Sequence, residues 1–235
     1  MNGIELKKFK DRKPVRAFVF TGGKDFCPEK MTDIPCEGDL VIAADSGCKS
    51  VMAFSSAVKE TVPDIIVGDM DSYDIKNLAA SFPDSEFFPF PPEKDYTDTA
   101  LAVSVALECG CREIVIAGGL GGRLDHTFAN VFLLEHIRSM GARCIITDGK
   151  NRAYLAESEN ILESCADEAK NRKYVSLIPF DGEVYDVIMD ENFKYPYTAK
   201  SIERRLFVTV SNEIIKYPAK IIVGGGTALI AECGE

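Results

Sequence analysis

Short apolar runs alternate with longer helical patterns along the first 150 residues of the chain. Six runs are rich in β-branched or aromatic residues and bounded by Gly, Pro or Asp, which predicts strands: Val15–Phe20, Leu40–Ala44, Pro63–Val67, Glu86–Phe90, Ile114–Ala117 and Cys144–Thr147. Four segments between them predict helices: Lys49–Ala57, Tyr73–Phe82, Thr97–Cys109 and Leu124–Met140. This alternation predicts a mostly parallel, Rossmann-like α/β sheet flanked by helices on both faces.

The pattern changes after about residue 150. Short apolar runs separated by turn residues predict further strands at Tyr174–Pro179, Val184–Met189, Leu206–Val210 and Lys220–Val223. Little helical periodicity remains, which indicates a smaller antiparallel β domain of sandwich or barrel type. We therefore expect an α/β domain over residues 1–150 and a β-sandwich domain over residues 151–235. The polar segment 158–170 is expected to be a solvated loop or a short helix.

Polar residues and glycines follow most of the predicted strands of the first domain. They are Thr21–Gly23, Asp45, Asp69 with Asp71, and Gly118–Arg123. The carboxyl ends of parallel strands meet at one edge of a sheet, where open α/β sheets bind their ligands. The sequence therefore predicts one shared site at this edge. Glycines such as Gly22 and Gly23 can let backbone amides approach a phosphate, although a plain tight turn is the commoner explanation of such a pair.

Aspartates dominate the chemistry of this predicted site. Asp69 and Asp71 are two residues apart in an extended segment and so point the same way, while Asp95 and Asp98 flank Thr97 before a helix. Carboxylates without thiol or imidazole partners suit Mg²⁺ rather than zinc. Each aspartate taken singly is also an ordinary turn or helix-cap residue, and Thr97 is the expected N-cap of its helix. The group as a whole favours a cation site.

A further candidate is the segment Gly121–His126, which opens the longest predicted helix. Glycines before a helix expose amide donors to an anion, and Arg123 can bind phosphate with two parallel hydrogen bonds. Asp125 can add a carboxylate to the metal site. His126 is expected to make a structural hydrogen bond more often than to act as an acid or base, because a catalytic histidine needs a specific partner.

Composition narrows the possible functions. The formal net charge of −10 argues against a general nucleic-acid binder, but it leaves a nucleotide substrate open. The 8 cysteines show no zinc-type spacing, and the charged N-terminus lacks the apolar core of a signal peptide. No apolar run approaches the ~20 residues that cross a bilayer. We expect free thiols in a reducing cytoplasm and no membrane partner.

Four motifs follow one another along the first domain: A-D-S-G at Ala44–Gly47, P-D-x-x-x-G-D-M-D-S at Pro63–Ser72, K-D-Y-T-D-T-x-L-A at Lys94–Ala102 and G-G-R-L-D-H-x-x-A-N at Gly121–Asn130. Together they resemble the thiamine diphosphokinase (thiamine pyrophosphokinase) family. Shorter matches lie at Asp148–Asn151, Phe193–Pro196 and Ser211–Glu213. The resemblance implies a homodimer that transfers the diphosphate of ATP to the hydroxyl of thiamine. Thiamine would bind where the β domain completes a pocket across the dimer interface.

The resemblance also implies roles for single residues. Acidic residues would organise metal and phosphates, and they are Asp45, Asp69, Asp71, Asp95, Asp98 and Asp125. Of these, Asp69, Asp71, Asp95 and Asp98 are the expected catalytic residues, and Mg²⁺ is expected at Asp69, Asp71 and Asp98. Nucleotide contacts are expected from Thr21, Gly22, Lys94, Thr97 and Arg123, with Ser211 and Asn212 near the thiamine. The chain has no tryptophan, so Tyr195 or Tyr197 would supply the aromatic face for the thiamine cation.

Two other functions remain open on the sequence. The same aspartates could serve a different Mg²⁺-dependent phosphotransferase or phosphohydrolase. The chain could instead be a non-catalytic thiamine or nucleotide sensor, although binding alone does not require so many carboxylates. The family resemblance favours the diphosphokinase over both.

Overall fold

The structure is a computed structural model that describes residues 6–68, 77, 80–90 and 96–234. The chain divides into two compact units, one of residues 1–149 and one of residues 150–235. The first unit combines a parallel sheet with helices, and the second is built from antiparallel strands. The α/β class and the all-β second part predicted from the sequence are confirmed.

The described part of the first unit contains six parallel strands in the order β6-β5-β1-β2-β3-β4. Their bounds are Arg16–Phe20 for β1, Leu40–Ala44 for β2, Ile65–Gly68 for β3, Glu86–Pro89 for β4, Glu113–Ala117 for β5 and Arg143–Thr147 for β6. All six predicted strands are confirmed. The four central strands are buried almost throughout, as expected for β-branched runs with helices on both sides.

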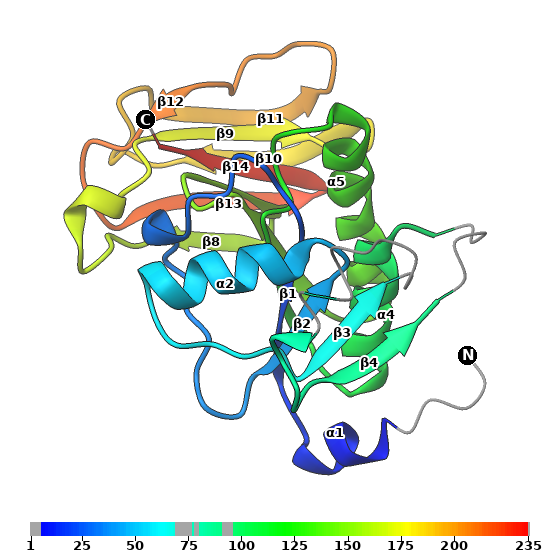
Figure 1. Ribbon diagram of the computed structural model, residues 1–235. Coiled ribbons are helices and arrows are strands. Elements are labelled where there is room, and N and C mark those ends of the chain that lie inside the picture. The colour runs from blue at the N-terminus through cyan, green and yellow to red at the C-terminus, as the bar shows by residue number, and fades with distance from the viewer. Residues whose placement is uncertain (1–5, 69–76, 78–79, 91–95, 235) are drawn as a thin grey trace. The chain divides into compact units, whose positions relative to one another are not determined.

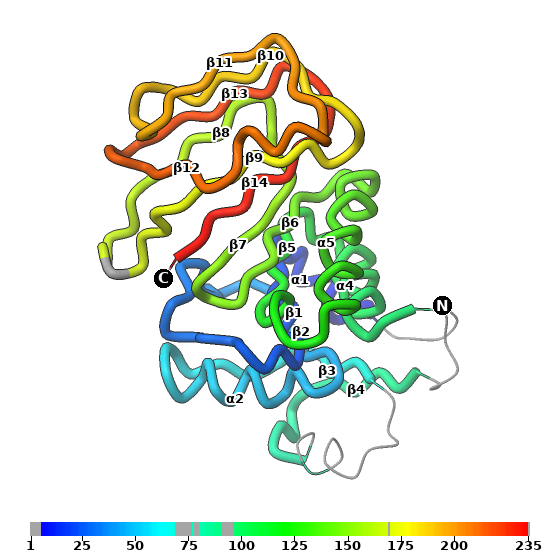
Figure 2. Tube along the Cα trace, turned by 90° about the horizontal axis from the view of Figure 1, so that it is seen from above, coloured from blue at the N-terminus to red at the C-terminus, as the bar shows by residue number. Residues whose placement is uncertain are grey.

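Helices cover both faces of this sheet. Helix α2 (Gly47–Ala57) lies on one face, whereas α4 (Asp98–Glu108) and α5 (Leu124–Ser139) lie on the other, as Figures 1 and 2 show. On the α2 face, Phe18, Phe20 and Phe54 belong to one fully buried cluster. The predicted helix Tyr73–Phe82 falls mostly outside the described residues. Two short helices were not predicted, α1 (Lys7–Arg12) and the 3₁₀ turn η1 (Pro28–Lys30).

The strand order reverses at β1. The chain proceeds from β1 through β2 and β3 to β4 in one direction, and β5 and β6 then add on the other side of β1. The connections that leave β1 and β5 therefore lead to opposite sides of the sheet. Such a switch point is where doubly wound sheets form their binding crevice. The backbone amide of Thr21 still donates to the carbonyl of Ala117 at 2.8 Å, which closes the sheet just below that crevice.

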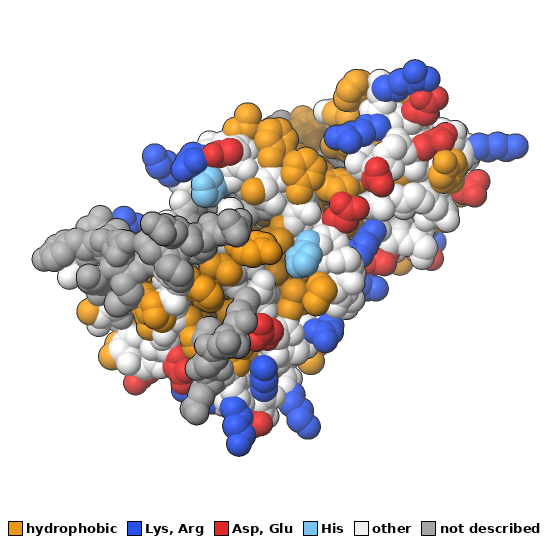
Figure 3. Space-filling model, turned by 90° about the vertical axis from the view of Figure 1, so that its right-hand side faces the viewer, with side chains coloured by type: hydrophobic (Ala, Val, Ile, Leu, Met, Phe, Trp, Pro, Cys, Tyr) orange, Lys and Arg blue, Asp and Glu red, His pale blue; other side chains and the backbone are white. Residues whose placement is uncertain are grey.

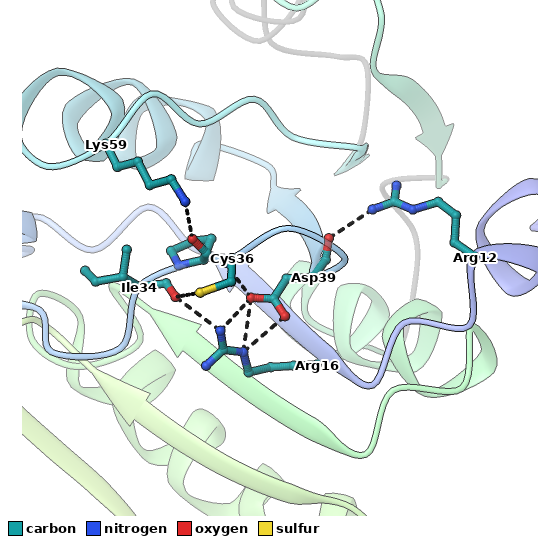
Figure 4. A network of polar contacts seen from close by, with 7 residues as sticks. Arg12, Arg16, Ile34, Cys36, Asp39 and Lys59 are labelled. Atoms are coloured by element: carbon teal, nitrogen blue, oxygen red, sulfur yellow. Dashed lines mark hydrogen bonds and ion pairs between the residues drawn. The ribbon is translucent and has the colours of Figure 1, made fainter.

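Ion pairs hold the opposite, amino edge of the sheet together (Figure 4). Arg16, at the start of β1, donates from Nη2 to Asp39 Oδ2 at 2.6 Å, and this pairing raises the pKa of Arg16. Arg12 pairs with Asp64, whose other oxygen accepts the amide of Val41 at 2.9 Å. These contacts connect Asp39, before β2, to the beginning of β1, and Asp64, before β3, to the end of α1.

The second unit contains two antiparallel sheets with strand orders β12-β9-β14-β7 and β11-β10-β13-β8. The strands are Asn151–Leu155 (β7), Glu159–Leu162 (β8), Tyr174–Pro179 (β9), Glu183–Met189 (β10), Tyr197–Glu203 (β11), Asn212–Glu213 (β12), Ala219–Gly225 (β13) and Ala228–Cys233 (β14). One buried cluster includes Leu177 and Ile230 from the first sheet and Val187 and Ile221 from the second. The two sheets therefore share a single apolar core.

One expectation for this unit is wrong, and another holds only in part. Leu206–Val210 forms turns rather than a strand, and its apolar side chains at 206, 207, 208 and 210 are exposed. The segment 158–170 contains the strand β8 as well as the 3₁₀ turn η2 (Glu168–Lys170), because alternate residues Asn160 and Leu162 are buried. No helix among the described residues is long and apolar enough to cross a membrane.

Candidate functional site

A polar cavity of about 470 Å³ lies at the carboxyl edge of the first unit. Its walls come from the loops after β1, β2 and β5 and from the beginnings of α4 and α5. The cavity brings together six of the residues predicted from the sequence: Thr21, Gly22, Asp45, Thr97, Asp98 and Arg123. Four other predicted residues, Asp69, Asp71, Lys94 and Asp95, lie outside the described residues. The cavity lies at the edge of the sheet where the strand-end pattern predicts a shared site.

Glycines line the floor of the cavity because neighbouring loops pack tightly there. A Cβ atom on Gly22 would lie 1.9 Å from the Ser46 hydroxyl oxygen, and one on Gly23 would lie 2.2 Å from the Gly118 carbonyl oxygen. Gly118 itself has a φ of 77°, a conformation that favours glycine. The close approach of the loops after β1 and β5 therefore requires glycine at these positions.

Asp45 stands at the end of β2 in a strained backbone conformation. Its φ is 51°, which is uncommon for a residue other than glycine. The conformation is fixed by a 2.7 Å hydrogen bond from its amide to the carbonyl of Val67. Its half-buried carboxylate lines the cavity. Such strain often accompanies a side chain held for binding or catalysis.

The N-cap and first turn of α4 contribute Thr97, Asp98 and Thr99 to the cavity wall. The hydroxyl of Thr97 accepts the amide of Ala100 at 3.2 Å, which confirms Thr97 as the N-cap. Asp98 is the first residue of the helix, where the helix dipole favours a negative charge. Thr97 and Asp98 are therefore held by the helix terminus at the rim of the cavity.

At the beginning of α5, Arg123 pairs with Asp125. Arg123 Nε lies 3.1 Å from Asp125 Oδ1 and Nη2 lies 2.5 Å from Oδ2. This contact lowers the pKa of Asp125 and raises that of Arg123, and both side chains are mostly exposed. Arg123 lines the cavity, whereas Asp125 reaches it only through this pair. A phosphate could exchange with the carboxylate on the same face of the guanidinium.

Two observations about this loop were not predicted. The carboxylate of Asp25, in the loop after β1, accepts the amide of Gly122 at 2.8 Å. The imidazole of His126 lines the cavity but has no hydrogen-bond partner in the described part of the chain, so the structural hydrogen bond expected for it is not found. Asp25 could have been noticed only from its position directly after Gly22-Gly23-Lys24.

The residues expected near thiamine lie in the second unit. The Asn212 side chain is buried and bonded to backbone: Oδ1 accepts the amides of Tyr195 and Glu213, and Nδ2 donates to the Tyr195 carbonyl. Ser211 is exposed with a φ of 59°. The Tyr195 ring is 59% exposed with the Lys194 ammonium 5.4 Å from its centroid. Asn212 thus braces the backbone that carries Tyr195.

Carboxylate oxygens in the cavity fit a hard cation. Asp45 supplies them directly after β2 and Asp98 supplies them from the start of α4, and such ligands suit Mg²⁺. Among residues 6–68, 77, 80–90 and 96–234, no group of three or more acidic, histidine or cysteine side chains forms a metal site. Asp45 and Asp98 could hold a metal together with further ligands.

Comparisons with known proteins agree on one family. Residues 36–146 match the family model described as thiamin pyrophosphokinase, catalytic domain. The chain is 28% identical to thiamine pyrophosphokinase of Bacillus subtilis over 200 residues, 84% of this chain and 88% of that protein. It is 26% identical to thiamin pyrophosphokinase 1 of Caenorhabditis elegans over 183 residues, 74% of this chain and 70% of that protein.

Solved structures give the same result for the fold. The crystal structure of the Geobacillus thermodenitrificans thiamin pyrophosphokinase superposes with a TM-score of 0.77 at 27% identity, covering 94% of this chain and 98% of that one. The Bacillus subtilis structure gives a TM-score of 0.79 at 24% identity, covering 94% and 99%. The similarity extends over both units of the chain.

Proposed function

Since the chain belongs to the thiamin pyrophosphokinase family, we propose that it transfers the diphosphate of ATP to the hydroxyl of thiamine, giving thiamine diphosphate and AMP. The observation that carries this proposal is the cavity at the switch point of the parallel sheet. It joins glycine-rich turns, the cationic side chains of Lys24 and Arg123, and carboxylates from a strand end and a helix start. A polyphosphate with its metal needs this combination, because the protein contributes mainly positioning and charge stabilisation to such a transfer.

The triphosphate would be held by the loops after β1 and β5. Gly22 and Gly23 carry no side chain between their backbone and a ligand, and Lys24 and Arg123 add positive charge to the cavity wall. Arg123 can exchange its Asp125 partner for a phosphate, because two phosphate oxygens can accept the same pair of hydrogen bonds. Lys94, outside the described residues, is proposed to contact phosphate as well.

Mg²⁺ would be held by Asp98 together with Asp69 and Asp71, which are outside the described residues, while Asp45 and Asp95 complete the acidic site. When bound, the ion would neutralise charge on the phosphate oxygens. The half-buried carboxylate of Asp45 supports this proposal. Loss of thiamine-dependent AMP formation on chelation, with recovery on adding Mg²⁺, is the expected result.

The chemical step forms one bond and breaks one bond. The thiamine hydroxyl oxygen bonds to the β-phosphorus, the bond from that phosphorus to the bridging oxygen breaks, and AMP leaves with the electron pair. The hydroxyl proton passes to a carboxylate, for which Asp71 and Asp98 are the candidates. The variants Asp98→Asn and Asp71→Asn distinguish the two candidates. The variant that has lost the base is expected to lose turnover while it still binds ATP. Full turnover in both variants would reject a carboxylate base at either position.

We propose that thiamine binds to the second unit near Ser211, Asn212 and Tyr195. The bonds of Asn212 to the Tyr195 backbone support a positioning role for this amide. The exposed Tyr195 ring would face the thiamine cation. Tyr195→Ala is expected to raise the KM for thiamine and to leave the KM for ATP unchanged. An unchanged KM for thiamine would remove Tyr195 from the site.

A homodimer would bring thiamine-binding residues to the cavity of the partner. The exposed apolar side chains of the second unit support this proposal, and they are Leu206, Phe207, Val208 and Val210. Phe207→Ser is expected to shift the protein toward the monomer in light scattering and to lower turnover in parallel. A monomeric wild-type chain would contradict the proposal.

The decisive experiment measures AMP formation from ATP and Mg²⁺ with and without thiamine, with mass detection of thiamine diphosphate. Equal amounts of AMP and thiamine diphosphate are expected. ADP in place of AMP would indicate attack at the γ-phosphorus and a different kinase, and thiamine-independent release of phosphate would indicate a hydrolase. Thiamine binding without turnover would favour the sensor.

All eight cysteines are free, which supports our expectation of a reducing cytoplasm.

A further inference from the structure

Two neutral polar side chains in the cavity wall are buried and have no partner for one of their polar atoms. Asn130 on α5 is 6% exposed, and Thr99 on α4 is 7% exposed. The Nδ2 of Asn130 donates to the carbonyl of Gly119 at 2.9 Å. A carbonyl only accepts, so this bond fixes the amide and directs Oδ1, an acceptor, away from Gly119.

The unpartnered atoms border the cavity. In the described part of the chain, neither Asn130 Oδ1 nor the Thr99 hydroxyl makes a hydrogen bond. Every side-chain polar atom that is fully enclosed there does have a hydrogen-bond partner, so these two atoms are not fully enclosed. Both atoms are therefore reached from the cavity that these residues line. Buried polar groups are almost always hydrogen-bonded, so a ligand atom is the expected partner of each.

The charge of the ligand group follows from these two side chains. Asn130 Oδ1 accepts hydrogen bonds and therefore repels a phosphate oxygen. The charged residues that line the cavity are others: Lys24, Asp45, Asp98 and Arg123. A neutral group that donates to Asn130 and exchanges a hydrogen bond with Thr99 fits this part of the wall. A sugar hydroxyl does both, because it carries one donor and two acceptor lone pairs.

We propose that Asn130 and Thr99 bind the ribose hydroxyls of the nucleotide co-substrate, an inference that rests on the proposed function and assigns part of its ATP site. The ribose is joined directly to the α-phosphate, so its hydroxyls lie nearest to phosphates held by the glycine loops of the same cavity. The amino group of thiamine lies at the far end of that molecule from its reacting hydroxyl. The two side chains would then discriminate ribonucleotides from deoxyribonucleotides.

The test pairs ligand changes with side-chain changes. Binding of the Mg²⁺ complexes of ATP, 2′-deoxy-ATP and 3′-deoxy-ATP is measured by calorimetry for the wild type, Thr99→Val and Asn130→Leu. The wild type is expected to bind at least one deoxynucleotide roughly five- to tenfold more weakly than ATP, the value of one or two hydrogen bonds. In the variant that lacks the matching side-chain atom, this ratio falls to about one.

Matched controls keep the result specific. Ser104→Ala on α4 and Ser139→Ala on α5 remove hydroxyls that bond only within their own helices, and both are expected to keep the wild-type ratio. Thr99→Val preserves the shape of the side chain, so it tests the proposal even if Asn130→Leu unfolds. Calorimetry does not require turnover, and therefore failure of the diphosphotransferase assay leaves this test intact.

Two outcomes would overturn the assignment. Equal binding of ATP and both deoxynucleotides by the wild type would show that neither hydroxyl is recognised. Unchanged discrimination in both variants would place the recognition elsewhere, and a raised KM for thiamine in the same variants would assign the two side chains to thiamine instead.

Discussion

The carboxylate of Asp25 accepts the backbone amide of Gly122 at 2.8 Å and so joins the loop after β1 to the loop before α5. These residues are 97 positions apart in the chain. The two loops form facing walls of the cavity, since Lys24 and Gly122 both line it. Gly121 and Gly122 have φ values of 81° and 67°, a backbone conformation that favours glycine. The Asp25 side chain helps to hold the loop in this conformation.

Asp25→Ala is therefore expected to lower binding of Mg-ATP by roughly tenfold, since a loop amide loses its charged partner. Asp25→Asn keeps an acceptor oxygen and is expected to recover most of the loss. Calorimetric titration with Mg-ATP gives both values, and urea unfolding checks that the fold is intact. If Asp25→Ala bound ATP as the wild type does, the loop would be held without this contact.

Arg123→Ala is expected to weaken ATP binding by roughly 10- to 100-fold, the range for charge-assisted hydrogen bonds. The reason is that the guanidinium lines the cavity and can exchange Asp125 for phosphate. Thiamine binding serves as the control, because Arg123 is assigned to the nucleotide alone. Equal loss for both ligands would indicate a general disturbance of the cavity.

The same variant changes the titration of Asp125. Arg123 lowers the pKa of this carboxyl, so Arg123→Ala is expected to raise it toward the usual value of about 3.9. A lowered carboxyl pKa stabilises the fold above the unfolded-state pKa, and that stabilisation is lost as the pH falls through the folded-state pKa. Carboxyl carbon NMR between about pH 2 and pH 6 measures the shift. An unchanged midpoint would show that the pair does not persist in solution.

The sequence predicted the parallel sheet well because its central strands are buried runs rich in β-branched or aromatic residues, such as Leu40–Ala44. It failed for Tyr197–Glu203, a strand in which only Ile202 is fully buried. It also failed for Leu206–Val210, whose apolar side chains are exposed on turns. Apolar runs predict burial only where another layer covers them, and the sequence alone does not give that layer.

Prediction from the sequence also succeeded for only some residues of the candidate site. Asp45, Thr97 and Arg123 were predicted because residues at strand ends and helix starts share one edge of a parallel sheet. Asp25 and Asn130 were not, since their roles depend on backbone groups of Gly122 and Gly119 that only the tertiary fold brings close.

Gly47→Ala is expected to destabilise the first unit by about 1–3 kcal/mol, the usual cost of overpacking. A Cβ at this position would lie 2.0 Å from the carbonyl oxygen of Phe20, a backbone atom that cannot rotate away. Gly225→Ala in the second unit is the control, because its Cβ would lie 3.6 Å from the Tyr185 ring in ordinary contact. Urea unfolding followed by circular dichroism compares them. Similar stabilities for the two variants would show that α2 can shift to admit the methyl group.

The ion pair between Arg16 and Asp39 is expected to contribute to stability at the amino edge of the sheet. Asp39 accepts three side-chain hydrogen bonds from Arg16 and one from the Cys36 amide, and the carboxylate side chain is 11% exposed. Asp39→Ala leaves the guanidinium and this amide without their acceptor, so a loss of about 1–3 kcal/mol is expected. Lys8→Ala is the control, because the Lys8–Glu86 pair is 62% and 37% exposed and such pairs contribute less than about 1 kcal/mol. The stabilities of both variants are measured by urea unfolding at low and at high salt. If the loss of stability in Asp39→Ala vanished in high salt, the pair would be held by long-range attraction alone, and the hydrogen bonds at this edge would add nothing.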